Sequence, residues 1–296
     1  MIDNIVILGI SGSTAYIFNE EFPELKKIDI VPYNIKYSRY LPVTLSLMFD
    51  LFRIFRVIKR EHAQLENIIR EHKIDVVISD NRFGLYHPLI ESVYITHQLT
   101  IKAGVFSGLA NSIHHRFIKK FNHVWVPDFA DPERSLAGEL SVNTVSKHAK
   151  YIGPLSRLDA SVIKTDTYDI LCLLSGVEPQ RSMLEVKLIE CFKGSAKKIC
   201  LVRGTKDVLK VEPEGNFTVI DLPNAGLLAQ CIRNSTAIIC RSGYSTLMDL
   251  HKFQKKELIL IPTPGQTEQL YLAHYWQKKY GAKVLKQRNS QNFEFD

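Results

Sequence analysis

The feature that most constrains this chain is a repeated alternation of short apolar runs with turns and helical stretches. In the first half the runs are NIVILGI, KIDIVPY, IDVVISD, SVYITHQ and HVWVPDF, and in the second half they are DILCLLSG, KKICLVRG, FTVIDL, AIICRSG and ELILIPT. This alternation is typical of βα units, because a parallel strand needs a long crossover, usually a helix, before the next strand. The sequence therefore predicts an α/β protein with mostly parallel sheets.

The alternation is interrupted once, by the polar segment SRLDASVIKTDTYD, which has no clear period. We interpret this segment as a linker between two Rossmann-like open-sheet domains with a cleft between them, and 296 residues suffice for two cores of ordinary size. The expected parts are an N-terminal Rossmann-like domain over 1–155, a linker over 156–168, a C-terminal Rossmann-like domain over 169–285 and a polar tail over 286–296.

Charge and cysteine content narrow the classes of partner. A formal net charge of +7 favours an anionic partner, which leaves nucleic acid, an acidic lipid surface or a phosphorylated small molecule. Nucleic acid is not expected, because the chain has no RNP-type aromatic motif, zinc-finger spacing or long Lys/Arg tract. The five cysteines lack metal-binding spacing and are expected to be buried thiols. A secretory leader and a long apolar tract are absent, so we expect a cytoplasmic protein.

Small and basic residues follow three predicted strands of the second half. These turns are Ser175-Gly176, Arg203-Gly204-Thr205 and Arg241-Ser242-Gly243. In an open parallel sheet, ligands bind beyond the carboxyl ends of the strands, where helix N-termini present free N–H groups. Each turn alone is ordinary turn chemistry, but three at one end of a single sheet predict a site for a phosphate or diphosphate.

Further polar groups accompany these turns. The helix after the third turn carries Ser245 in its first turn and then Asp249, a carboxylate that suits a ribose diol, the alternative being a solvated helix acid. The last strand is followed by PGQTEQ, in which Glu268 and Gln269 begin a helix. Carboxylate and amide groups together suit sugar hydroxyls, which need both donors and acceptors.

Two residues of the first half are candidates for a general base. Asp80 ends one predicted strand and His97 follows another, so both are expected near the cleft. A hydroxyl that attacks an electrophilic carbon must lose its proton, and either side chain can take that proton. The alternative for Asp80, in the run Asp-Asn-Arg, is ordinary turn and cap chemistry.

The segment from 41 to 62 combines apolar side chains with bases. Its sequence, LPVTLSLMFDLFRIFRVIKREH, places Leu, Met, Phe and Ile around much of a helix and gathers four bases towards its end. Such a helix can lie at an anionic membrane surface. The alternative is an ordinary core helix whose basic last turn suits its dipole.

At the turns of the second half the sequence resembles nucleotide-sugar glycosyltransferases of the GT-B fold. It most resembles the family containing the N-acetylglucosaminyltransferase that makes lipid II, together with bacterial relatives of unassigned substrate. The run Cys240-Arg241-Ser242-Gly243 followed by Asp249 resembles that family's CRSG turn and its ribose-binding acid, which is normally glutamate. Ser175-Gly176 resembles the first glycine-serine turn of the donor domain, although GGSxG is reduced here to LSGVEPQR.

The resemblance assigns further roles. Leu222 falls where the family's backbone binds the uracil edge, and Glu268 and Gln269 fall on the paired glutamines that read the donor sugar. Thr96-His97-Gln98 resembles the family's His-Glu-Gln turn on the acceptor side. The family begins with a GxGH loop that occurs nowhere here, and IVILGISGSTAYIFNEEFPEL looks like its second βα unit. We therefore expect either that the chain is missing its first unit or that this protein dispenses with it.

The resemblance implies transfer of a sugar, an N-acetylhexosamine, from a UDP-sugar to a cell-envelope or lipid-linked acceptor at the inner face of the plasma membrane. The UDP-sugar is a co-substrate, and no other cofactor is expected. Because no DxD motif lies at a strand end, helix N-termini and Arg241 are expected to stabilise the leaving group in place of a divalent metal. The alternatives are a nucleotide-sugar hydrolase or epimerase, and a non-catalytic nucleotide-sugar-binding paralogue.

Overall fold

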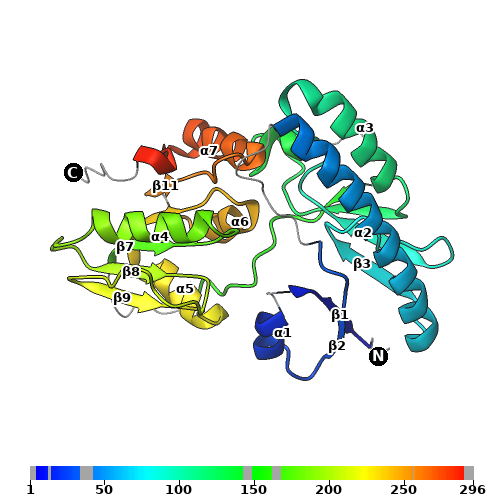
Figure 1. The fold of residues 1–296 in the computed structure, drawn as a ribbon, viewed down its shortest axis with the longest axis horizontal. Coiled ribbons are helices and arrows are strands. Elements are labelled where there is room, and N and C mark those ends of the chain that lie inside the picture. Colours follow the sequence, from blue (N-terminus) through cyan, green and yellow to red (C-terminus); the bar gives the residue numbers. More distant parts are fainter. Residues whose placement is uncertain are drawn as a thin grey trace. The chain divides into compact units, whose positions relative to one another are not determined.

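The structure, a computed structural model, describes residues 5–12, 15–33, 43–142, 149–161, 168–255 and 257–289. The chain divides into two compact units, which are coloured along the sequence in Figure 1. Unit 1 comprises residues 1–99, 108–126 and 143–151, and unit 2 comprises residues 100–107, 127–142 and 152–296. Three stretches of the expected N-terminal domain, 100–107, 127–142 and 152–155, therefore belong to the second unit.

Unit 2 is built on a six-stranded sheet in which every neighbouring pair is parallel. Its strands are β7 (Tyr168–Leu173), β8 (Ile199–Val202), β9 (Phe217–Ile220), β10 (Ser235–Cys240), β11 (Leu258–Leu260) and β12 (Lys283–Val284), in the order β12-β11-β10-β7-β8-β9. The helices between them are α4 (Gln180–Cys191), α5 (Ala225–Asn234), α6 (Tyr244–Lys252) and α7 (Thr267–Tyr280). The predicted α/β class is confirmed.

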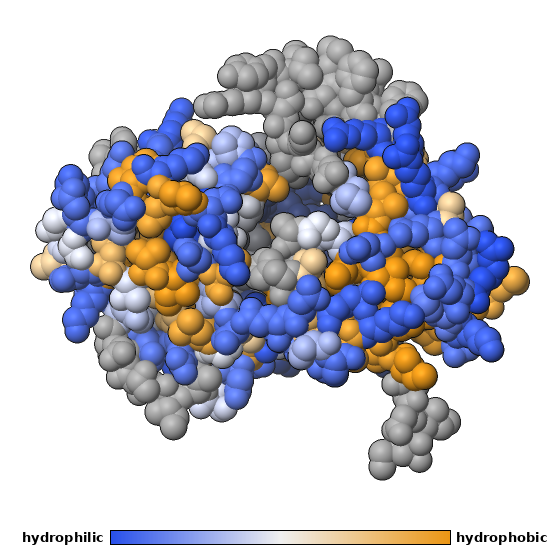
Figure 2. Space-filling view, turned by 60° about the horizontal axis from the view of Figure 1, so that its bottom comes forward, coloured by the Kyte–Doolittle hydropathy of each residue, from blue (hydrophilic) through white to orange (hydrophobic). Residues whose placement is uncertain are grey.

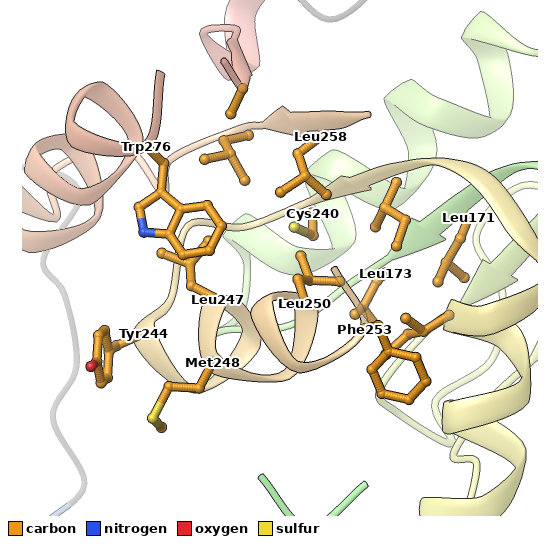
Figure 3. Packing of buried hydrophobic residues seen from close by; sticks show 14 of the residues in the cluster. Leu171, Leu173, Cys240, Tyr244, Leu247, Met248, Leu250, Phe253, Leu258 and Trp276 are labelled. Atoms are coloured by element: carbon orange, nitrogen blue, oxygen red, sulfur yellow. The ribbon is translucent and has the colours of Figure 1, made fainter. Parts of the chain in front are cut away.

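Both faces of this sheet are apolar, as expected for a parallel sheet with helices on each side. Successive residues of a strand point to opposite faces, so Leu171 and Leu173 join one core cluster while Ile170 and Cys172 join another. Figure 3 shows the first cluster, in which these leucines lie with side chains of α6 and with Trp276 of α7. The central strands are therefore buried on both sides, and polar chemistry is confined to the strand ends.

The stretch 127–142 belongs to unit 2 because its apolar residues complete the first core cluster. Leu136 and Leu140 are fully buried there, and the Trp276 indole N–H donates to the Leu136 carbonyl at 2.9 Å. The Tyr244 hydroxyl donates to the Pro127 carbonyl at 2.8 Å. Buried Asp128 orders the stretch by accepting hydrogen bonds from the main chain at 136 and 137 and from two serine hydroxyls. A 3₁₀ turn, η3 (Gly138–Leu140), lies within it.

Unit 1 contains two smaller parallel sheets. β1 (Ile7–Ile10) pairs with β2 (Lys26–Asp29), and β3 (Val76–Asp80), β4 (Glu91–Ile95), β5 (His123–Val126) and β6 (Ala149–Tyr151) pair in that order. The helices are α1 (Ala15–Glu21), α2 (Val43–His72) and α3 (Ser107–Ile118).

Two further 3₁₀ turns, η2 (Gly104–Phe106) and η4 (Gln287–Asn289), belong to unit 2 and not to unit 1.

Helix α2 contains most of the segment predicted to contact a membrane. Residues 41 and 42 lie outside the described residues, as do the side chains of 43–52. In the described remainder Arg53, Arg56, Lys59 and Arg60 are exposed, whereas Ile58 is buried. The face drawn in Figure 2 carries hydrophilic side chains interspersed with apolar areas. Within the described ranges, none of the helices combines the length and the apolar character that a bilayer crossing requires.

Candidate functional site

The three predicted turns lie side by side at one edge of the sheet of unit 2. They follow β10, β7 and β8, which are adjacent in the strand order and parallel. From β7 the chain runs outward to β8 and β9, then returns to β10 and continues outward to β11 and β12. The order therefore reverses between β7 and β10, the position at which open α/β sheets bind ligands. Ser175-Gly176 and Arg241-Ser242-Gly243 flank this switch point.

The N-terminus of α6 presents amide groups at the switch point. Gly243 is its N-cap residue and offers no capping side chain, and a Cβ added there would meet no atom within 4 Å. The Ser242 hydroxyl is fully buried and donates to the Gln269 carbonyl at 2.7 Å, while Ser245 in the first turn is exposed. Uncapped N–H groups and the positive end of the helix dipole favour an anion here.

Arg241 begins the third turn, and its side chain is bound within the protein. Its side chain is 1% exposed. One terminal nitrogen donates to the carbonyls of Ile261 and Pro262 at 3.0 and 3.3 Å, and the other donates to the Gln180 carbonyl and the Gln287 side chain, both at 2.8 Å. Burial lowers its pKa to about 10. The guanidinium thus joins the segment after β11 to the first residue of α4 and to Gln287. Its role at a bound nucleotide stays a prediction.

Arg203 is also engaged within the protein. It donates to both carboxylate oxygens of Glu185 at 3.1 and 3.2 Å and to Asp221 at 2.7 Å. Arg181 shares the same Glu185 carboxylate, which is 1% exposed. Burial alone lowers the pKa of Arg203, but the two carboxylates outweigh it and raise that pKa. Its guanidinium therefore joins α4 to the ends of β8 and β9, while the expectation that its turn borders a phosphate site stays a prediction.

The glycines of the first two turns serve different purposes. Gly204 has φ +69°, and a Cβ there would lie 2.9 Å from the Leu174 carbonyl, so only glycine allows the loops after β7 and β8 to approach this closely. Gly176 has φ +99° and is exposed, beside half-buried Ser175. Leu222 is half-buried directly after β9, at the same edge of the sheet.

Asp249 of α6 is held by the first residue of the expected linker, Ser156. The Ser156 hydroxyl donates to its Oδ1 at 2.6 Å. The pKa of Asp249 is raised, because burial outweighs the opposing effects of the Ser156 hydrogen bond and of the charges of Arg157 and Lys252. Ser156 also lines a pocket of about 350 Å³, whose other residues are Phe129, Pro154, Leu155, Met248, His251 and Lys252. Asp249 is thus a half-buried, hydrogen-bonded acid and not a solvated helix acid.

Glu268 and Gln269 lie in the first turn of α7 and are both half-buried. The Gln269 side-chain oxygen accepts from the Thr263 amide at 2.8 Å, so that oxygen orders the loop after β11. No side chain caps this helix, whose N-cap residue is Gln266. Both residues stand at the same edge of the sheet as the three turns, because they follow β11.

Asp80 and His97 interact electrostatically in unit 1. Asp80 ends β3 and is exposed, and His97 is half-buried two residues after β4. Partial burial raises the pKa of Asp80, and the charge of His97 lowers it. Neighbouring Asn81 accepts a hydrogen bond from the Tyr94 hydroxyl at 2.9 Å, so the strand end is ordered. The structure brings together the two residues named as general-base candidates.

A buried polar network in unit 1 escaped the sequence analysis. Glu61 of α2 is fully buried and accepts from the Tyr33 hydroxyl and the Gly84 amide, both at 2.9 Å, and from Arg82. Arg82 also donates to the Ser11 hydroxyl at 3.0 Å and to the Val31 carbonyl. The network orders the segments after β1, β2 and β3. In the sequence, the network is indicated only by an acid, Glu61, that directly follows the bases Lys59 and Arg60.

The described residues contain no group of three or more His, Cys, Asp or Glu side chains placed to hold a metal ion.

Comparison with known proteins relates this chain to glycosyltransferases. Residues 180–294 match the glycosyltransferase family 28 C-terminal domain. A search of the curated proteins finds no match. The solved structure of the glycosyltransferase of kitacinnamycin has a TM-score of 0.63 and 13% identity, over 94% of this chain and 78% of that chain.

Two further solved structures contain nucleotides. Spinosyn rhamnosyltransferase SpnG, complexed with thymidine diphosphate, has a TM-score of 0.54 and 9% identity over 90% of this chain and 77% of that chain. S. aureus MnaA, in a co-structure with UDP, has a TM-score of 0.50 and 12% identity over 96% of this chain and 90% of that chain. These likenesses show the fold, two Rossmann-like units of the GT-B class, and the family match over unit 2 supports a glycosyltransferase.

Proposed function

We propose that this protein transfers an N-acetylhexosamine from a UDP-sugar to a hydroxyl of a cell-envelope or lipid-linked acceptor. The binding of the UDP-sugar donor is supported by one observation. Three loops and the uncapped N-terminus of α6 lie together at the switch point of the sheet of unit 2. The family match over residues 180–294 supports sugar transfer. The closer resemblance to the lipid II-forming family stays a prediction.

In the proposed reaction, the acceptor oxygen attacks the anomeric carbon and loses its proton to a base. The bond from that carbon to the diphosphate breaks, and UDP leaves with the electron pair. The amide groups of α6 stabilise the developing negative charge, assisted through space by the buried guanidinium of Arg241. Asp249 binds the ribose diol, and Glu268 and Gln269 face the sugar. No divalent metal is assigned a role in this proposal.

Unit 1 supplies the acceptor side in this proposal. Asp80 and His97 are the general-base candidates, and they lie close enough to interact electrostatically. The exposed bases of α2, which are Arg53, Arg56, Lys59 and Arg60, favour contact with anionic lipid at the inner face of the plasma membrane. Such contact suits a lipid-linked acceptor.

Calorimetric titration with UDP, thymidine diphosphate and uridine tests the donor assignment. We expect UDP to bind, and uridine to bind at least about tenfold more weakly, because most donors at the site serve the diphosphate. The titration is run with and without EDTA, and affinity is expected to be the same. Failure to bind UDP would contradict the proposal, and tighter binding of thymidine diphosphate would contradict the uridine assignment.

Product analysis separates transfer from hydrolysis. With a UDP-N-acetylhexosamine and no acceptor, a transferase releases little UDP, whereas a hydrolase releases UDP and free sugar. Addition of a lipid-linked acceptor is expected to restore UDP release in step with glycosylated product. Free sugar formed at the same rate with and without acceptor would instead establish the hydrolase alternative.

Replacement of Asp249 by asparagine is expected to weaken UDP binding about tenfold, because the amide keeps the size of the carboxylate but loses half of its acceptor capacity. The affinity for 2′,3′-dideoxy-UDP is expected to be unchanged by the substitution. Ser156→Ala is the matched control, since it removes the hydrogen bond to Asp249 and leaves the acid in place. An equal loss for both nucleotides would refute a ribose-specific role.

A further inference from the structure

Two buried polar groups at the edge of the sheet of unit 2 have no hydrogen-bond partner among the described residues. They are the Nε of Arg241 and the Oγ1 of Thr263, on side chains that are 1% and 4% exposed. Arg241 contacts the segment that leads into Thr263, because it donates to the carbonyls of Ile261 and Pro262, which directly precede Thr263. Buried polar groups in native proteins are nearly always bonded, so such a pair marks a place where another molecule completes the bonding.

The Thr263 hydroxyl lies against the turn after β7. A Cβ added at Gly176 would have Thr263 Oγ1 at 3.9 Å as its nearest neighbour. The main chain of Thr263 is held by Gln269, whose side-chain oxygen accepts from its amide. Because β10 lies between β7 and β11, this approach spans the end of β10, where α6 begins. The hydroxyl therefore adjoins the switch point.

The charge at this place favours an anion. The four groups that accept hydrogen bonds from Arg241 are three main-chain carbonyls and one side-chain amide, so none of them neutralises the buried cation. The uncapped N-terminus of α6 adds a second positive contribution. The Thr263 hydroxyl can donate a hydrogen bond, as the amide groups at the N-terminus of α6 can. Cationic and donor groups together suit a phosphoryl oxygen.

We propose that Thr263 is a binding residue for the diphosphate of the nucleotide, and that its hydroxyl donates to a phosphoryl oxygen when the Gly176 turn moves aside. This inference rests on the proposed function. The turn suits such a movement, because Gly176, Val177 and Glu178 are exposed and Gly176 has a positive φ that glycine adopts without strain. Thr263 is thus assigned a role that its place between two prolines of the sequence did not suggest.

Calorimetry on Thr263→Val and Thr263→Ser tests this assignment. Valine has the shape of threonine without the hydroxyl, and serine keeps the hydroxyl. We expect Thr263→Val to weaken UDP binding about tenfold and to leave uridine binding unchanged, and Thr263→Ser to bind UDP nearly as the original protein does. The thermal midpoint of Thr263→Val is expected to be equal or higher, because the substitution removes a buried hydroxyl that has no partner.

The outcomes separate this inference from the function on which it rests. If the original protein binds UDP and Thr263→Val binds it equally well, the hydroxyl has no role and the proposed function stands. The same conclusion follows if Thr263→Val loses UDP and uridine affinity together, since that indicates a general disturbance of the site. If the original protein itself fails to bind UDP, the proposed function falls, and the inference falls with it.

Discussion

Arg241→Ala is expected to reduce UDP affinity by at least about a hundredfold and to lower the free energy of unfolding by roughly 3–5 kcal/mol. The side chain holds the carbonyls of Ile261, Pro262 and Gln180, and its loss leaves these buried acceptors without their donor. It also removes the cation nearest to the switch point. Both effects should appear together, in calorimetry and in urea denaturation.

Arg241→Lys is the matched control, because lysine keeps the charge but cannot reproduce a forked set of four hydrogen bonds. This variant is expected to lose stability while it retains more UDP affinity than Arg241→Ala at a temperature where both are folded. Uridine binding should change little in either variant. UDP affinity unchanged in folded Arg241→Ala would rule out a role for this guanidinium in diphosphate binding.

Glu185→Ala is expected to lower the free energy of unfolding by roughly 3–5 kcal/mol, and no effect on ligand binding is predicted for it. The substitution leaves Arg181 and Arg203, both almost fully buried, without the carboxylate that they share. Asp221 remains as a partner of Arg203 but is half-exposed. Urea denaturation followed by circular dichroism measures the change through the transition midpoint.

The control for Glu185→Ala is Glu214→Ala, which breaks the exposed pair between Lys193 and Glu214. Exposed ion pairs contribute little, so this variant is expected to unfold at the same urea concentration as the original protein. A similar midpoint for Glu185→Ala and Glu214→Ala would show that the buried network does not hold α4, β8 and β9 together.

Much of the fold and part of the site could be predicted because they depend on local patterns. Apolar runs separated by helical segments require parallel strands, and parallel strands place all their carboxyl ends at one edge. This is why Ser175-Gly176, Arg203 and Arg241 were expected at the same edge of one sheet, where the structure places them. The same reasoning placed Glu268 and Gln269 at the start of a helix.

The roles of the two arginines could not be predicted in the same way. A turn containing arginine has the same sequence whether the guanidinium extends to solvent or folds back under the loops. Arg241 folds back because carbonyls of Ile261, Pro262 and Gln180, which are distant in sequence, converge around it. Arg203 is bound by Glu185 for the same reason. The unpartnered hydroxyl of Thr263 is likewise visible only once β7 and β11 lie on either side of β10.

By itself the sequence determined the α/β class, the parallel strands and the edge of the sheet at which the polar turns lie, because hydrophobic periodicity and strand direction act over short distances along the chain. Tertiary structure decided that residues 127–142 belong to unit 2, that Ser156 holds Asp249, and that two arginines are bound within the protein. Each of these depends on partners from distant segments. Long polar side chains follow those partners, and local sequence does not specify them.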